Sequence, residues 1–166
     1  MREGGLVPLA RTVLGGLRLF VHLDRPAKWV FDETYYAKDA WAILQSGYER
    51  QWVEDANDMI LAGDLSGMKE AAAYIVHPPV GKLLIAAGEA MFGMNPFGWR
   101  FMALLFGTLL VFFTIRMARR LSRSTLIGGV AGLLITFDGL AFMMSRIALL
   151  DIFQATFAVA GVAALV

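Results

Sequence analysis

The sequence predicts an all-α, polytopic membrane protein, and three observations support this fold class. Of the 166 residues, 58% are hydrophobic and only 17% are charged, a composition typical of membrane proteins. Several apolar stretches approach the length of about 20 residues that a helix needs to cross a bilayer. The net charge of +1 argues against nucleic acid as a partner. Because there is no cysteine, zinc fingers, thiol catalysis and disulfide frameworks are excluded.

The first predicted element is a marginal transmembrane segment within residues 1–23. The apolar stretch 4–23 has the length of a span but carries Arg11, Arg18 and His22 on one helical face. A central arginine costs about 2.5 to 3.5 kcal/mol in an inserted helix. We therefore expect either a span packed against a polar neighbour or a helix lying in the membrane interface.

Residues 24–98 form a predicted polar loop domain, with eleven acidic and six basic residues and a net charge of −5. Within it, apolar residues at helical spacing predict a helix over 34–45 that ends at Ser46-Gly47. The stretch 47–67 is rich in turn residues and is expected to be irregular. A second helix should begin at Pro79 and continue to Phe92, and it is too short to span, so we expect it to lie along the membrane surface.

Residues 99–166 contain three further predicted spans, over 99–118, 124–144 and 147–166. The protein would thus have about four transmembrane helices and one long polar loop. The last stretch ends in the run AVAGVAALV without a polar cap, as we expect of a chain cut inside or just after a span.

Four arginines in the connection between the second and third spans predict the orientation of the protein: Arg116, Arg119, Arg120 and Arg123. Such a cluster marks the cytoplasmic side. Counting spans from this turn, the polar loop and the turn at Ser145-Arg146 fall on the outer face, and Met1-Arg2 falls inside if the first segment spans.

The first candidate for chemistry is the pair Asp32-Glu33, which follows the first apolar segment and opens the loop helix. Carboxylates at a helix N-terminus can simply cap free amides. Their position at the outer membrane surface suggests the alternative that one of them accepts a proton from an acceptor hydroxyl.

The second candidate is the segment HPPVGK, from His77 to Lys82. A helix start with a nearby cation can hold a phosphate group. Alternatively, the two prolines only begin the helix, His77 bonds to a neighbour and Lys82 reaches the lipid headgroups.

The third candidate is Arg146, with Asp151 five residues later, at the junction of the last two predicted spans. An ionisable residue at the membrane boundary is costly and indicates function by default. Guanidinium matches phosphate oxygens, so Arg146 could neutralise a phosphate leaving group. The alternative is an interfacial anchor, and Asp138 and Asp151 could be partners of buried arginines.

Other chemistries receive little support from the sequence. The acidic residues around Asp55 lack the spacing of a calcium-binding loop, so we predict no metal site. There is no phosphate-binding loop or dinucleotide fingerprint, which argues against a soluble nucleotide-sugar donor.

Four strings occur in order between residues 31 and 153: VFDETYYAKDAW, HPPVGKLLIAAGE, NPFGWRFMALLFGT and, after the arginine-rich turn, DGLAFMMSRIALLDIF. In this order they resemble the N-terminal part of the protein O-mannosyltransferases, most of all the actinobacterial members. The resemblance implies the C-type glycosyltransferase (GT-C) architecture, with many transmembrane helices and a long first extracytoplasmic loop that carries membrane-surface helices.

The resemblance also implies an activity and an environment. Mannose would pass from a polyprenyl-phosphate-mannose donor to Ser or Thr hydroxyls of secreted or membrane proteins, with inversion at the anomeric carbon. The enzyme would be a multi-pass protein of the plasma membrane, with its active site on the extracytoplasmic face. The lipid-linked donor would be its substrate, no further cofactor is implied, and the secretion machinery is a candidate partner.

Residue roles follow from the same resemblance. Asp32 matches the family's loop carboxylate, expected to act as the base, and Glu33 is its acidic neighbour. His77 and Lys82 lie in the family's HPP-x-G-K segment. Arg146 matches the arginine expected near the donor phosphate, in the same S-R-x-x-L-L-D segment as Asp151.

Three alternatives remain open at this level. The chain could belong to another GT-C enzyme with a different lipid-linked sugar, since the sugar rests on the resemblance alone. A transporter fragment, with Asp138, Arg146 and Asp151 along a substrate path, is less favoured because no internal repeat is visible. A scaffold subunit would leave Asp32 and Arg146 far apart and individually paired.

Overall fold

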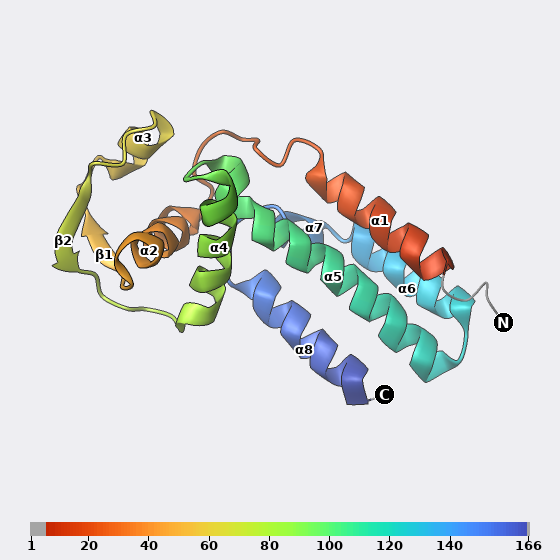
Figure 1. Ribbon diagram of the computed structural model, residues 1–166. Helices are drawn as coiled ribbons and strands as arrows, with labels where there is room; N and C mark the ends of the chain where they lie inside the picture. Colours follow the sequence, from red (N-terminus) through yellow and green to blue (C-terminus); the bar gives the residue numbers. More distant parts are fainter. Residues whose placement is uncertain (1–5, 166) are drawn as a thin grey trace. The chain divides into compact units, whose positions relative to one another are not determined.

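The structure, a computed structural model, describes the backbone of residues 6–165 and the side chains of residues 10–165. Within this range the chain is mostly helical and has two short strands (Figure 1). The helices are α1 (Leu6–Phe20), α2 (Glu33–Ser46), α3 (Ala56–Leu61), α4 (Pro79–Phe92), α5 (Pro96–Ser122), α6 (Thr125–Phe137), α7 (Gly139–Met144) and α8 (Asp151–Leu165). The strands are β1 (Arg50–Trp52) and β2 (Met68–Ala72).

The chain divides into two compact units. We call the first the helical unit; it comprises Met1–Val21, Ala103–Arg146 and Asp151–Val166. The second, the loop unit, comprises His22–Met102 and Ile147–Leu150. The predicted boundaries at residues 23 and 98 thus lie close to the ends of the main segment of the loop unit.

In the loop unit, α2 packs against α4, and both helices follow their sequence signals. Gly47 ends α2 with a left-handed φ of 81°, and its N–H bonds to the carbonyl of Ile43, as glycine commonly does after a helix. Pro79 is the first residue of α4, where its missing N–H costs nothing. Both predicted helices are confirmed, α4 with the same bounds and α2 within one residue at either end.

The prediction that 47–67 is irregular, and with it the strictly all-α fold class, is wrong in part. Strands β1 and β2 form an antiparallel pair in which Arg50 faces Ala72 and Trp52 faces Met68, and α3 lies between them along the chain. The strands are only 3 and 5 residues long, so a period-2 pattern had too few residues to be recognised.

Helix α4 has an inverted distribution of polarity. Its two charged residues, Lys82 and Glu89, are buried, whereas its exposed residues are all apolar. These exposed residues are Pro79, Val80, Leu83, Ala87, Ala90, Met91 and Phe92. A helix at the surface of a water-soluble protein shows the opposite arrangement.

In the helical unit, α1 packs against α6, and α8 joins α5 through a hydrogen bond from Thr156 Oγ1 to the carbonyl of Phe106, 3.0 Å (Figure 1). Among the described residues, α5 alone is both long and apolar enough to cross a membrane. Its 27 residues extend over about 40 Å, more than the roughly 30 Å of a bilayer core.

Two predicted spans differ from the helices observed. The span predicted over 124–144 is interrupted at Asp138, whose extended backbone separates α6 from α7. Asp138 Oδ1 accepts a hydrogen bond of 2.7 Å from the N–H of Ala141 and so caps α7. The span predicted from 147 becomes helical only at Asp151. Helix α1 covers residues 6–20 of the first predicted segment, residues 21–23 form a turn, and residues 1–5 of that prediction lie outside the described residues.

Candidate active site

A tight turn before α2 presents Asp32. The N–H of Glu33 bonds to the carbonyl of Val30 at 3.2 Å, and the N–H of Val30 bonds to Glu33 Oε2 at 3.0 Å. Between them Phe31 has a φ of 54°, a strained value for a large side chain. Asp32 occupies the cap position of α2, but its side chain makes no capping hydrogen bond. The alternative that it caps the helix through its carboxylate is therefore not observed.

The Asp32 carboxylate is unpaired within the part of the chain that the structure describes. No hydrogen bond or ion pair of that carboxylate occurs there, and the residue is partly exposed. A carboxylate with open lone pairs can accept a proton or a hydroxyl hydrogen bond. This freedom distinguishes Asp32 from its neighbour.

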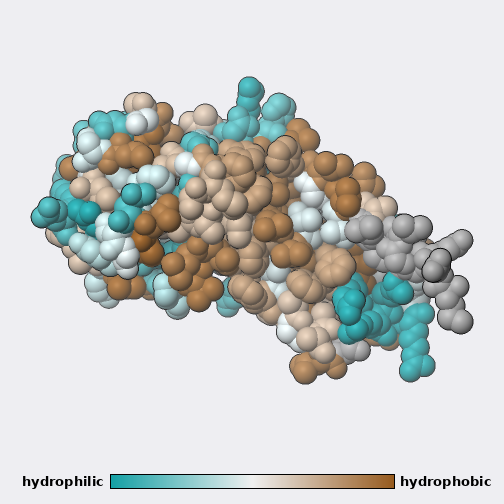
Figure 2. Space-filling view, in the orientation of Figure 1, coloured by the Kyte–Doolittle hydropathy of each residue, from teal (hydrophilic) through white to brown (hydrophobic). Residues whose placement is uncertain are grey.

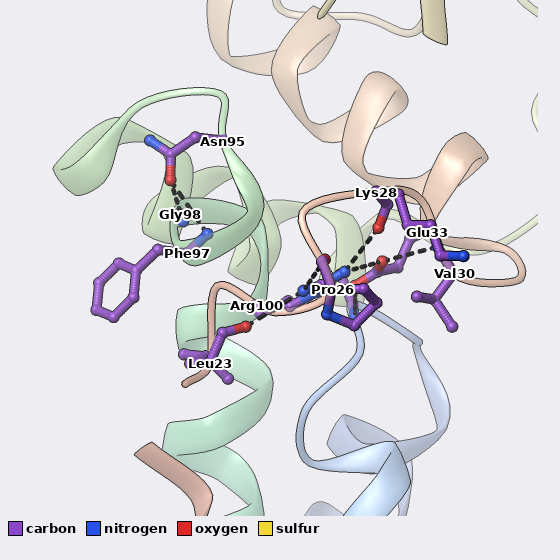
Figure 3. A network of polar contacts seen from close by, with 10 residues as sticks. Leu23, Pro26, Lys28, Val30, Glu33, Asn95, Phe97, Gly98 and Arg100 are labelled. Atoms are coloured by element: carbon purple, nitrogen blue, oxygen red, sulfur yellow. Dashed lines mark hydrogen bonds and ion pairs between the residues drawn. The ribbon is translucent and has the colours of Figure 1, made fainter. Parts of the chain in front are cut away.

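Glu33 lies at the centre of a buried network with Arg100 of α5 (Figure 3). Arg100 Nε bonds to Glu33 Oε1 at 2.7 Å and Arg100 Nη2 bonds to Oε2 at 2.8 Å, a bidentate pair. Glu33 Oε1 also accepts from the N–H of Ala148 at 3.0 Å. Both residues are fully buried. The Glu33 carboxylate is thus occupied on both oxygens.

The remaining donors of Arg100 bind the loop that precedes the turn. Its Nη1 bonds to the carbonyls of Leu23 and Pro26 at 3.2 and 2.9 Å, and its Nη2 bonds to that of Lys28 at 3.0 Å. Figure 3 shows these carbonyls converging on the guanidinium. Together with Glu33, Arg100 therefore fixes the backbone on both sides of the Asp32 turn.

Sequence reasoning missed Arg100, although a signal existed. Arg100 is a charged residue near the start of the longest apolar helix, and such a residue is a functional or structural candidate by default. Its partner Glu33 lies 67 residues away, so no local pattern could connect them.

Lys82 forms a second buried ionic cluster, which joins α4 to α2. Its Nζ lies 2.9 Å from Asp39 Oδ2 and 2.8 Å from Glu49 Oε1. Burial raises the pKa of Asp39, although Lys82 opposes this shift. Burial alone would lower the pKa of Lys82, but its hydrogen bonds to the two carboxylates produce a net increase. Lys82 does not extend outward, as its predicted alternative role at the lipid headgroups required.

A cavity of about 460 Å³ in the loop unit brings three of the predicted site residues together. Asp32, His77 and Lys82 all line it, and the His77 and Tyr36 rings meet edge to face with centroids 5.5 Å apart. The other lining residues are Tyr35, Tyr36, Lys38, Asp39, Arg50, Gln51, Trp52, Val53, Ala73, Tyr74 and Val76. Half of the lining residues are charged or polar and half are aromatic or aliphatic, and polar groups that converge on an apolar wall are typical of a ligand site.

Arg146 and Asp151 belong to the helical unit. Arg146 Nη1 bonds to the carbonyls of Leu19 and Val21 at 2.8 and 2.6 Å, at the end of α1. Its guanidinium also lies 5.3 Å from the centre of the Phe142 ring. Asp151 is exposed in the first turn of α8.

Arg18 of α1 makes a similar contact with the end of α6. Its Nη1 donates to the carbonyl of Thr136 at the end of α6, and its guanidinium stacks near Phe137 and Phe142, 4.7 and 4.5 Å from the ring centres. Of the predicted basic face of α1, Arg18 thus contacts the end of α6, whereas Arg11 Nη1 is buried without a hydrogen bond among the described residues. As to metals, the described residues contain no group of three or more His, Asp or Glu placed to hold an ion.

Comparison with known proteins gives the class to which this fold and site belong. Residues 9–166 match the profile of the dolichyl-phosphate-mannose-protein mannosyltransferase family. The chain belongs to this family, which is membrane-integral. No solved structure matches the chain.

Individual relatives agree with the family. The chain is 43% identical to the polyprenol-phosphate-mannose--protein mannosyltransferase of Mycolicibacterium smegmatis, over 98% of this chain and 29% of that protein. It is 42% identical to the protein of the same name from Mycobacterium tuberculosis, over 98% and 28%. An undecaprenyl phosphate-alpha-4-amino-4-deoxy-L-arabinose arabinosyl transferase of Pseudomonas aeruginosa is 32% identical, over 82% and 22%. The chain thus spans less than a third of the length of these relatives.

Proposed function

We propose that this chain carries the catalytic carboxylate of a mannosyltransferase that moves mannose from polyprenyl-phosphate-mannose to Ser or Thr hydroxyls of exported proteins. The observation that carries the proposal is the unpaired Asp32 carboxylate on the wall of the loop-unit cavity. The family and the names of the mycobacterial relatives supply the donor and the protein acceptor. Because two mycobacterial relatives at 42–43% identity carry the mannosyl name, mannose is favoured over another lipid-linked sugar.

In this proposal Asp32 is the general base. It takes the proton of the acceptor hydroxyl as the hydroxyl oxygen forms a bond to the anomeric carbon of mannose, while the bond from that carbon to the phosphate oxygen breaks. Such proton transfer contributes about 10² to 10⁴ in rate. An oxocarbenium-like transition state with inversion places the base and the phosphate on opposite faces of the sugar.

The other site residues divide into positioning and donor-binding roles. We assign Glu33 a positioning role, because both of its oxygens are occupied by buried donors. Lys82 holds Asp39 and Glu49 in place. His77, which is exposed beside the cavity, and the Arg146–Asp151 segment are the candidates for contact with the donor phosphate and sugar.

We further propose a multi-pass topology in the plasma membrane with the active site on the extracytoplasmic face. Helices α1, α5, α6 with α7, and α8 would be the four spans, and the arginine-rich C-terminal end of α5, together with Arg123 after it, would be cytoplasmic. Figure 2 shows hydrophilic residues gathered at the end of the helical unit where α5 meets α6. The apolar exposed face of α4 supports its placement at the membrane surface.

The test replaces Asp32 by Asn in a chimera in which residues 1–166 substitute for the matching part of the Mycolicibacterium relative. Membranes are supplied with radiolabelled polyprenyl-phosphate-mannose and a Ser/Thr-rich peptide. We expect the loss of at least about 100-fold in turnover with unchanged membrane insertion. The matched control is Asp24→Asn, an exposed carboxylate of the same unit that does not line the cavity. Near-normal transfer by the Asp32→Asn chimera would refute the assignment of the base.

A further inference from the structure

The segment Tyr74–Val76 continues from β2 toward α4 without joining any regular element. The last bond that ties this part of the chain to the hairpin runs from the N–H of Ala73 to the carbonyl of Glu49, 2.9 Å. Beyond it, Tyr74, Ile75 and Val76 are 87%, 65% and 66% exposed. Aromatic and β-branched residues of this kind favour strands, yet this short run lacks a neighbouring strand.

The backbone of this segment is unpaired as well as exposed. Within the described range, no hydrogen bond involves the N–H or C=O groups of Tyr74, Ile75 or Val76. Backbone polar groups in a folded protein normally bond to other backbone, to side chains or to water. A row of open donors and acceptors that continues a strand is a template for another extended chain.

This open edge borders the cavity that contains the proposed base. Tyr74 and Val76 line the cavity together with Asp32, as do Ala73 before them and His77 after them, whereas Ile75 does not. The open backbone of this segment therefore lies beside the cavity. In a chain paired along it as a strand, side chains alternate between the two sides, so every second one would face the side on which Asp32 lies.

The cavity wall also holds a polar donor that has no acceptor within the described range. The indole Nε1 of Trp52, on β1, is buried and makes no hydrogen bond there. Indole N–H is a donor only, and a buried donor without an acceptor carries a free-energy penalty. A rotation of the Trp52 ring, which lines the cavity, would expose this N–H to a carbonyl or hydroxyl oxygen of a bound ligand.

From these observations we propose that the acceptor polypeptide binds as an extended strand along Tyr74–Val76, with Ser or Thr side chains delivered into the cavity at alternate positions. This inference rests on the proposed function. Backbone pairing requires no particular side chains, so it suits an enzyme that modifies hydroxyls within varied unfolded segments. Every second residue of the acceptor would be accessible to Asp32 in one binding register.

The competing occupant of an exposed apolar segment in a membrane protein is the bilayer itself. A lipid environment suits the exposed face of α4, because its backbone groups are bonded within the helix. It does not suit Tyr74–Val76, because hydrocarbon offers no partner for the open N–H and C=O groups of this segment. The unpaired backbone therefore favours a polypeptide over a lipid surface.

The first test uses acceptor peptides with N-methyl groups at successive backbone positions and the chimera described above. An N-methyl group removes one N–H donor and leaves the side chains unchanged. In a paired strand the N–H groups of alternate residues face the partner. We expect methylation at these alternate positions to lower transfer about tenfold for each lost bond and methylation at the positions between them to have little effect. Equal transfer by the two sets of peptides would overturn the inference. Absence of transfer to the unmodified peptide would instead refute the proposed function.

The second test does not depend on catalysis. A photoreactive phenylalanine analogue is placed at position 75 in the membrane-bound chain, with position 61 on α3, also exposed, as the control. We expect crosslinking of the Ser/Thr peptide from position 75 and not from position 61. Crosslinks from position 75 to lipid alone would overturn the proposal in favour of a membrane contact.

A third test examines the unpaired indole. Trp52→Phe keeps an aromatic ring and removes the donor. We expect the KM for the peptide to rise severalfold while the pH profile of turnover, which reports the base, stays the same. An unchanged KM would remove Trp52 from the acceptor site.

Discussion

In the loop unit the Arg100 guanidinium meets a carboxylate, whereas in the helical unit Arg18 and Arg146 meet backbone carbonyls at the ends of helices. The difference follows from composition. Of the acidic side chains that the structure describes, the helical unit has only Asp138 and Asp151, while the loop unit has eleven. Helix C-termini carry partial negative charge and open carbonyls, so they substitute for missing carboxylates.

This comparison shows two ways to keep a guanidinium in a largely apolar protein. A buried ion pair depends on both partners, because removal of either leaves an uncompensated charge. A helix-end contact involves no second formal charge, so its loss should cost less. Five predictions follow, from the largest expected effect to the smallest; the Arg100 and Arg146 variants test this contrast directly, and the others test unpaired charge and backbone strain in the loop unit.

Arg100→Met should destabilise the protein by about 3–5 kcal/mol, because Glu33 then remains buried without a countercharge. The measurement is the free energy of unfolding in detergent. The double variant Arg100→Met with Glu33→Gln is the control and should recover part of the loss. If Arg100→Met alone lowers the free energy of unfolding by less than about 1 kcal/mol, the pair behaves as a surface salt bridge.

Glu89 tests what happens when a carboxylate of the loop unit lacks a partner. It is buried, and both of its oxygens are without a hydrogen bond among the described residues. Glu89→Met should stabilise the protein by about 1–3 kcal/mol at neutral pH, because it removes a buried unsatisfied group. A loss of stability at neutral pH would reveal a partner for this carboxylate.

The same residue predicts a pH dependence. Burial raises the pKa of Glu89 well above its ordinary value of 4.5, so the folded chain binds this proton more tightly than the unfolded chain. Stability should therefore fall as the pH rises from about 4.5 through the folded pKa. Unfolding measured across this range should show the decrease in the natural chain and not in Glu89→Gln; parallel curves for the two would contradict the assignment.

Arg146→Met should lower the free energy of unfolding by about 1–2 kcal/mol, because it removes a cation from a partly buried helix C-terminus. The free energy of unfolding is again the measurement, and Arg18→Met at the end of α6 is the matched variant. A loss as large as that of Arg100→Met would mean that Arg146 compensates a buried charge instead of capping α1.

Phe31→Gly should have the smallest effect, a gain of about 1 kcal/mol or less. Glycine relieves the strain of a positive φ, about 1–3 kcal/mol, but loses more conformational entropy on folding. Phe31→Ala keeps the strain and is the control. Should Phe31→Gly unfold more easily than Phe31→Ala, the strain released at position 31 would be smaller than the conformational entropy that glycine loses on folding. A loss of stability in both variants would show that the ring of Phe31, although 76% exposed, contributes packing.

Much of the fold could be predicted because its signals are local. Pro79 marks the start of α4, Gly47 marks the end of α2, and the long apolar run of α5 is unmistakable. The β1–β2 pair escaped prediction because its strands are short and are separated along the chain by α3. The break at Asp138 escaped because an aspartate inside an apolar run can either remain in the helix or cap the next one.

The candidate site was predictable only in part. Asp32, His77 and Lys82 were chosen from sequence and share one cavity. Their different states were not predictable: Asp32 is unpaired, Lys82 is buried between two carboxylates, and His77 is exposed beside Tyr36. Those states depend on which side chains approach from other elements.

By itself, the sequence determined where α2 and α4 begin and end, that long stretches are apolar, and that two adjacent carboxylates lie at the start of α2. Only the tertiary structure decided which carboxylate is free. Glu33 forms an ion pair with Arg100, which lies 67 residues away along the chain. Asp32, the residue before Glu33, keeps open lone pairs. The physical reason is that hydrogen bonding and desolvation act between atoms that folding brings together, and the order of residues along the chain does not encode those contacts locally.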